Sequence, residues 1–156
     1  MKKIIAALLC VSTIFALCAC GKAENKLDSL AVSEYDEASL NTLVQLFIPQ
    51  RTVTDETAEL ALTLENLTDM DFTFDAAQRL EVYDGAQWRV IPDKQDAVAL
   101  VIYTLPANGT EDTMFYISGH YDTLAEGRYR IVLPLVAADG TQAVASAEFG
   151  IGRVEK

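Results

Sequence analysis

Strict alternation of apolar and polar residues constrains the fold of this chain more than any other feature of its sequence. In the stretch AELALTLEN, Leu60, Leu62 and Leu64 alternate with polar or small residues. Successive side chains of a β-strand point to opposite faces of its sheet, so this period of two predicts a strand with one buried face. Because no long stretch keeps a helical period instead, we expect the chain to fold mainly into strands.

Several further segments carry the strand pattern and are separated by turn residues. Strands are predicted in QRLEVY, QWRVIP, TMFYI, RYRIVLPL and QAVASAEFGI. Glycine follows Asp84, Asn108 and Asp139, and such pairs favour tight turns because glycine adopts positive φ without strain. About seven or eight short antiparallel strands over residues 42–156 therefore predict an all-β domain, a β-sandwich of two sheets.

The segment YDTLAEGRYRI has the spacing of a tyrosine corner, with Leu124, Gly127 and Tyr129 just before a predicted strand. In such a corner the tyrosine ring packs into the core while its hydroxyl bonds to backbone a few residues upstream. Gly127 supplies the backbone freedom that the turn requires. We therefore predict a structural role for these three residues, which would tie a connection between strands to the sandwich.

The order of four short motifs resembles that of bacterial immunoglobulin-like (Ig-like) domains. The motifs are LENLTD, LEVYDGAQW, LPANGT and YDTLAEGRYRI, and the resemblance covers residues 42–151. It implies an Ig-like sandwich of the kind common in lipoproteins and exported proteins of Firmicutes, and it supplies no catalytic residue. The segment MDFTFDAAQ departs from the family pattern, which usually has an aromatic-glycine turn there, so the strand boundary at this point stays open.

The first residues of the chain predict export. Two lysines precede an apolar run that ends at Ala19 and is shorter than the roughly 20 residues of a membrane-spanning helix. The sequence LCAC, which ends at Cys20, resembles the bacterial lipobox, whose cysteine receives a diacylglyceryl group after which the preceding residues are cleaved. The resemblance implies a lipoprotein signal peptide over residues 1–19 and lipidation of Cys20. An uncleaved anchor, or an ordinary cleavage site beside an unmodified Cys20, are the alternatives.

Lipid attachment would explain why Cys20 has no disulfide partner, since no cysteine follows it in the chain. Two acyl chains of the palmitate type, at about 0.8 kcal/mol per buried CH₂, give an upper bound on the order of 20 kcal/mol for membrane anchoring. We expect the protein on the outer face of the cytoplasmic membrane, with residues 20–41 as a lipid-anchored tether. The polar stretch YDEASL could instead form a short helical turn that leads into the first strand.

Charge argues against a nucleic-acid partner. Without residues 1–19 the chain holds 10 basic and 23 acidic residues, a formal charge of −13. A surface this acidic repels nucleic acid and anionic headgroups.

The only histidine, His120, lies between Ser118 and Asp122, a pattern that invites comparison with a catalytic triad. Side chains this close along one segment do not supply the geometry of nucleophile, base and orienting acid, so we interpret His120 as a solvated loop residue. No Cys/His cluster and no glycine-rich phosphate loop occurs in the sequence. We therefore predict no cofactor, no metal centre and no enzymatic activity.

Two other polar motifs allow a functional interpretation. Asp69, Asp71 and Asp75 could form a weak calcium site, although they lack the glycine and terminal glutamate of an EF-hand loop, and a solvated turn is the simpler interpretation. Asn66 begins a match to the glycosylation sequon, which we interpret as coincidental in a bacterial lipoprotein.

Aromatic residues provide the remaining candidates. Trp88 shares a strand face with Val90, which predicts a core role, whereas Tyr83, Tyr103 and Tyr116 are candidates for exposed aromatics. We expect a non-catalytic domain that displays loops or a sheet edge to a protein or cell-wall partner. A glycan-binding module that uses exposed aromatics and a proteinase-inhibitor-like sandwich are the alternatives.

Overall fold

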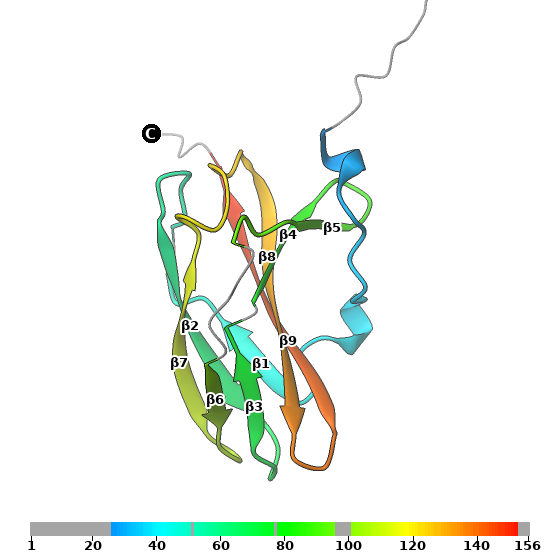
Figure 1. Ribbon diagram of the computed structural model, residues 1–156, viewed down its shortest axis with the longest axis vertical. Helices are drawn as coiled ribbons and strands as arrows, with labels where there is room; N and C mark the ends of the chain where they lie inside the picture. The colour runs from blue at the N-terminus through cyan, green and yellow to red at the C-terminus, as the bar shows by residue number, and fades with distance from the viewer. Residues whose placement is uncertain (1–25, 51, 77, 96–100, 153–156) are drawn as a thin grey trace, which may run out of the picture.

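A computed structural model describes residues 26–50, 52–76, 78–95 and 101–152 of the chain (Figure 1). Within this part the fold consists of nine strands and two short 3₁₀-helices, η1 (Lys26–Ser29) and η2 (Glu37–Ser39). The strands are β1 (Val44–Phe47), β2 (Glu59–Asn66), β3 (Phe72–Asp75), β4 (Arg79–Tyr83), β5 (Trp88–Ile91), β6 (Ile102–Leu105), β7 (Thr110–Tyr116), β8 (Gly127–Ala137) and β9 (Gln142–Ile151). The all-β prediction is confirmed.

The strands form two antiparallel sheets that pack as a sandwich. The small sheet has the order β1-β2-β7. The large sheet has the order β5-β4-β8-β3-β6, and β9 pairs with β8 along the opposite edge of that strand. The sequence predicts about seven or eight strands, and the described residues form nine.

The large sheet is irregular between β3 and β4. Both strands run antiparallel to β8, with Thr73 opposite Val136 and Arg79 opposite Val132. The chain advances six residues between Thr73 and Arg79 while its partner moves back only four, so this segment is two residues longer than the stretch of β8 opposite it. The backbone N–H of Gln78 donates to the carbonyl of Ala76 at 2.8 Å inside this interruption. The boundary left open in MDFTFDAAQ is therefore a bulge that divides one long strand.

The core between the two sheets contains the residues that alternation placed there. Leu60, Leu62 and Leu64 of β2 are at most 1% exposed, and they face Leu80 and Ile131 of the large sheet, which are fully buried. Complete burial of one such side chain contributes about 1.5–3 kcal/mol. Hydrophobic burial of this kind explains how the described domain stays folded.

Residues 30–41, which we call the N-terminal arm, lie against the large sheet and do not form a tether. The backbone N–H of Ser33 donates to Trp88 at 2.9 Å, and that of Val90 donates to Ala31 at 2.8 Å. The arm thus forms an antiparallel bridge between Val32 and Arg89 on the outer edge of β5, beside which it runs in Figure 1. Of the expected tether, residues 20–41, this part belongs to the domain because its backbone groups bond to β5.

The arm ends in the short helical turn that the sequence analysis kept as an alternative. Asp36 caps η2 by accepting a hydrogen bond of 3.0 Å from the backbone N–H of Ser39. Asn41 follows with a positive φ of 55°, and its side chain both donates to the Ser146 carbonyl at 2.9 Å and accepts from the Ser146 N–H at 2.8 Å. This pair fixes the end of the arm to β9. No helix in the described ranges has the length and apolar character needed to cross a membrane.

Candidate functional site

The two sheets are closed along one side of the sandwich and open along the other. On the closed side β1 packs beside β9, and Val53 bridges to Ile151 at the end of β9. The arm covers the edge of β5. On the open side β7 ends the small sheet and β6 ends the large sheet, and within the described ranges neither has a strand partner on its outer edge. Such edges are where a sheet can accept another strand.

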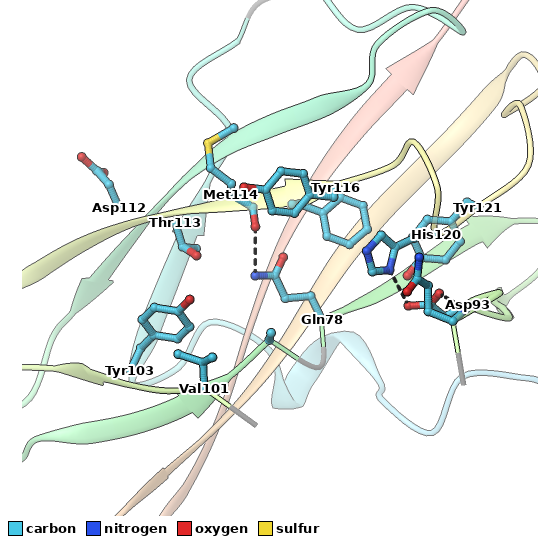
Figure 2. A pocket seen from close by; sticks show the side chains of 13 residues that line it. Gln78, Asp93, Val101, Tyr103, Asp112, Thr113, Met114, Tyr116, His120 and Tyr121 are labelled. Carbon is cyan, nitrogen blue, oxygen red and sulfur yellow. Dashed lines mark hydrogen bonds and ion pairs between the residues drawn. The ribbon is translucent and has the colours of Figure 1, made fainter. Parts of the chain in front are cut away.

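A cleft of about 600 Å³ lies between these two open edges, and we call it the β6–β7 cleft (Figure 2). One wall is β7, from Asp112 to Tyr116. Gln78 from the bulge, Asp93 after β5 and Tyr103 of β6 contribute to the opposite side. The bulge matters for this cleft because it turns Gln78 toward β7, where its Nε2 donates to the carbonyl of Met114 at 3.4 Å.

Three tyrosines give the cleft an aromatic lining. Tyr103 is 38% exposed and stacks on Phe74 with a centroid separation of 5.2 Å, and Tyr116 is 53% exposed. Tyr121 is buried and stacks on Phe115. Burial, with a further contribution from the negative charge of Asp93, raises the pKa of Tyr121 to about 12. Two of the three tyrosines that the sequence suggested as exposed therefore meet in one cleft.

The charged groups that line the cleft are acidic apart from one histidine. Asp93 Oδ2 lies 2.9 Å from His120 Nδ1, and Asp112 Oδ1 accepts a hydrogen bond of 2.7 Å from the Thr63 hydroxyl. Lysine and arginine are absent from its described lining. The cleft therefore favours cations or neutral donors over anions.

Gln78 also presents a polar atom that the described protein leaves unpaired. Its Oε1 is buried and accepts no hydrogen bond from any described residue. Buried acceptors almost always have a partner, so this oxygen needs a donor from a water molecule or from a ligand group that enters the cleft beside it.

The structure does not assemble a triad around His120. Its ring pairs with Asp93, and Asp122 forms an ion pair with Lys94. In the described part of the chain no hydrogen bond joins Ser118 to His120, so no nucleophile is activated there. The sequence could not identify Asp93 as the partner of His120, because Asp93 lies in the connection after β5 and His120 in the connection after β7.

The calcium candidate gains no support from the geometry. Asp71 Oδ1 accepts a hydrogen bond of 2.8 Å from the Ala107 N–H. This bond links the connection before β3 to the turn between β6 and β7. Among the residues that the structure describes, no three His, Cys, Asp or Glu side chains are grouped so as to hold a metal ion.

The connection before β8 has the geometry of a tyrosine corner. Tyr129 is 4% exposed, and its hydroxyl donates to the carbonyl of Ala125 at 2.7 Å. Leu124 is buried in the same cluster, and burial raises the pKa of Tyr129. Gly127 does not have the positive φ that would require glycine, contrary to the predicted role of its backbone freedom. A Cβ atom there would lie 3.3 Å from the Tyr129 ring, and this close approach explains the glycine.

The model of a bacterial Ig-like domain family matches residues 41–149. The chain belongs to this family. The match runs from the end of the arm to two residues before the end of β9. This is the region in which the Ig-like resemblance was seen. A search of curated proteins found no relative of this Ig-like domain.

Several solved structures share features of the Ig-like domain at low similarity. A Northeast Structural Genomics Consortium target, SoR45, is 14% identical with a TM-score of 0.44, and the match covers 72% of this chain and 88% of that one. The archaellum periplasmic stator protein FlaG from Sulfolobus acidocaldarius is 17% identical with a TM-score of 0.39, covering 69% and 100%. Such low TM-scores carry no information about the function of this Ig-like domain.

The large sheet of the Ig-like domain carries a buried polar network on the face away from the core. Arg130 Nε donates to Glu81 Oε2 at 2.6 Å, and the two side chains are 1% and 0% exposed. The Ser33 hydroxyl donates to the other Glu81 oxygen at 2.6 Å, and Arg130 also donates to the carbonyl of Tyr35 at 3.1 Å. The arm thus bonds to a buried ion pair that it helps to cover, and Glu34 of the arm forms a second, exposed ion pair with Arg79.

Trp88 is buried as predicted, but it packs within this network and is not part of the hydrophobic cluster between the two sheets. It is 6% exposed, and the Arg130 guanidinium lies 4.5 Å from its ring centroid. Trp88 and Val90 share a face as expected, but they pair with Tyr83 and Glu81, whose face is the outer one. Tyr83 packs on Trp88 at 5.3 Å, so it does not join the exposed tyrosines of the cleft.

Asn66 has a structural role that the sequence did not indicate. It is 2% exposed, and its Nδ2 donates to the carbonyls of Met70 and Pro106 at 2.7 and 2.9 Å. Its Oδ1 accepts from the Thr68 backbone at 3.0 Å. A glycan could not be accommodated on an amide buried in this way, so the sequon match reflects the turn chemistry of Asn and Thr. Cys20 lies outside the described residues.

Proposed function

We propose that this protein is an exported lipoprotein whose Ig-like domain binds a protein or cell-envelope partner and catalyses no reaction. The observation that carries the proposal is the pair of open sheet edges with an aromatic, acidic cleft between them. Every other edge of the described sandwich is covered, by the arm, by Asn41 or by the neighbouring strand of the second sheet. Membership of the Ig-like family supports an interaction module.

The anchoring part of the proposal rests on the lipobox that ends at Cys20. Diacylglyceryl on this cysteine would hold the protein on the outer face of the cytoplasmic membrane. Residues 21–25 separate Cys20 from η1, and a fully extended chain of that length reaches roughly 20 Å. Because the arm is bound to the sandwich, the domain would stay close to the membrane.

Fractionation of cells that express the full chain tests the anchor. We expect the wild-type protein in the membrane fraction, carrying a metabolically incorporated palmitate label, and the Cys20→Ala variant without label. Label on both proteins, or on neither, would overturn the proposed anchor.

Crosslinking in intact cells followed by mass spectrometry tests the interaction. A photoreactive residue at position 116, in the cleft, should capture an envelope component reproducibly. An equivalent probe at Gln142, outside the cleft, serves as a comparison. Absence of any adduct from both positions would overturn the proposed interaction module.

A second candidate function is glycan binding, which the exposed rings of Tyr103 and Tyr116 favour. Aromatic faces stack on the apolar faces of sugars, and Gln78 could accept a hydrogen bond from a sugar hydroxyl. Calorimetric titration with chitotetraose, a soluble β-1,4-linked glycan, would detect such binding. A heat of binding that Tyr103→Thr and Tyr116→Thr abolish would support this second function.

A further inference from the structure

We propose that the β6–β7 cleft binds an extended, lysine- or arginine-bearing segment of a partner protein, which adds a strand to β7. This inference rests on the proposed function, since it names the chemistry of the partner for the same cleft. Three observations carry it, namely the orientation of the backbone of β7, the charge of the cleft, and its exposed aromatic rings.

The backbone of β7 presents hydrogen-bonding groups toward the cleft. Ala61, which lies opposite Met114, donates its N–H to the side chain of Gln50 at 3.1 Å instead of to β7. Residues 61 and 114 therefore form a non-hydrogen-bonded pair, and the backbone groups of Met114 point away from β2. By the same alternation, Asp112 and Tyr116 present their N–H and C=O groups outward. The amide of Gln78, which donates to Met114, stands where the N–H of an added strand would lie.

The charge of the cleft selects a cationic partner segment. Asp93 lines the interior of the cleft, and Asp112 lies at its rim with its carboxylate turned toward Thr63 of β2; the described lining contains no lysine or arginine that could neutralise them. His120, which pairs with Asp93, is the one titratable base in the lining. The chain as a whole carries a formal charge of −11. A basic segment would therefore be steered toward the cleft, whereas an acidic one would be repelled.

The aromatic rings supply contacts that suit the same segment. Tyr103 and Tyr116 expose ring surface at opposite walls of the cleft, on β6 and β7 (Figure 2). Ammonium and guanidinium groups are attracted to the faces of such rings. The long aliphatic stem of a lysine or arginine would cover the exposed Val101, which is 45% accessible. A neutral glycan would use the rings and donate hydroxyl hydrogen bonds to the carboxylates, but without a charge its binding would depend little on salt.

Titration of the full chain, purified in a neutral detergent, tests the inference with four probes. The first is an acetylated and amidated peptide of four Thr-Lys repeats. The others are its Thr-Glu counterpart, a Thr-Lys peptide N-methylated at every second residue, and chitotetraose. We expect only the unmodified Thr-Lys peptide to bind well, with affinity that falls as salt rises. N-methylation should weaken binding more than tenfold, because it removes several strand hydrogen bonds.

Two variants locate the peptide. Asp112→Asn preserves the hydrogen bond from Thr63 but removes a charge, and Tyr116→Thr removes a ring from an exposed strand position. Each should weaken binding of the Thr-Lys peptide by about two- to fivefold. Asp69→Asn removes the same charge outside the cleft lining and should leave the affinity unchanged. Equal effects of Asp112→Asn and Asp69→Asn, or unchanged binding in both cleft variants, would overturn the site.

The other results of the peptide titrations and of the cellular crosslinking also test the inference. Equal binding of the Thr-Glu peptide would overturn the charge argument, and equal binding of the N-methylated peptide would overturn strand addition. If chitotetraose were the only probe to bind, the inference would be wrong and the glycan-binding function would be supported. If the cellular crosslinks form only at position 142, this inference fails while the proposed interaction module stands. If neither position captures a component, both fail.

Discussion

Arg130 and Glu81 form an ion pair with a separation of 2.6 Å, and neither side chain is more than 1% exposed. Removing two charges from water is expensive, and the pair recovers this cost only because its other hydrogen-bonding atoms are also satisfied. Ser33 and the carbonyl of Tyr35 provide those further contacts from the arm. The ion pair and the arm therefore depend on each other.

Breaking this ion pair from one side should destabilise the domain strongly. We expect Arg130→Met to lower the free energy of unfolding by about 3–5 kcal/mol, because Glu81 would remain buried without its partner. Combining Arg130→Met with Glu81→Leu should recover a large part of the loss. Urea unfolding followed by tryptophan fluorescence measures both. If the double variant were no more stable than the single one, the cost of the unpaired charge would be disproved.

The attachment of the arm to β5 can be tested separately from the ion pair. Ser33→Pro removes the N–H that bonds to Trp88, whereas Ser33→Ala keeps it and loses only the hydroxyl. We expect faster amide hydrogen exchange at Val90 in Ser33→Pro than in Ser33→Ala, since the Val90 N–H bonds to Ala31 of the same arm. Equal exchange in the two variants would show that the arm does not protect this edge.

The hydroxyl of Tyr129 should contribute measurably to stability. Tyr129→Phe keeps the buried ring but leaves the Ala125 carbonyl without its donor, so we expect a loss of about 1 kcal/mol or more. The thermal midpoint of unfolding reports this change. An unchanged midpoint would argue that the corner contributes through packing alone.

Asn66 should tolerate substitution poorly. Asn66→Ala deletes hydrogen bonds to the carbonyls of Met70 and Pro106, and we expect a loss of about 1–3 kcal/mol in chemical denaturation. Thr68→Val removes only one hydroxyl from the same turn and should cost less. The reverse order would contradict the central position of Asn66.

Asp84 should make the free energy of unfolding depend on pH in the acid range. Its carboxylate accepts hydrogen bonds from Arg89 and from the backbone of Gln87 and Ala86, which lower its pKa from 3.8 to about 2. A group whose pKa is depressed on folding contributes its full stabilisation above the unfolded pKa and loses it as pH falls toward the folded value. We expect Asp84→Asn to flatten the stability profile between about pH 4 and 2. If the free energy of unfolding of Asp84→Asn varied with pH as steeply as that of the wild type in this range, the contribution of Asp84 would be disproved.

Alternation predicted most strands correctly because one face of each lies in the core, as for Leu60 and Leu62. It could not say which face of the β5 segment is the inner one. The residues that decide this for Trp88 are Glu81 and Arg130, from β4 and β8, and they are buried beneath the arm and the Trp88 ring. Tyr103 and Tyr116 could be suggested as exposed, but their meeting in one cleft depends on which strands end each sheet. That order is set by pairings across distant parts of the chain.

The covered edge of β5 also matters when many copies crowd together. An uncovered edge is a template on which identical molecules can polymerise strand by strand. Since Ala31 and Ser33 already occupy the donor and acceptor groups of Val90 and Trp88, self-assembly through this strand is blocked by the chain's own N-terminal residues.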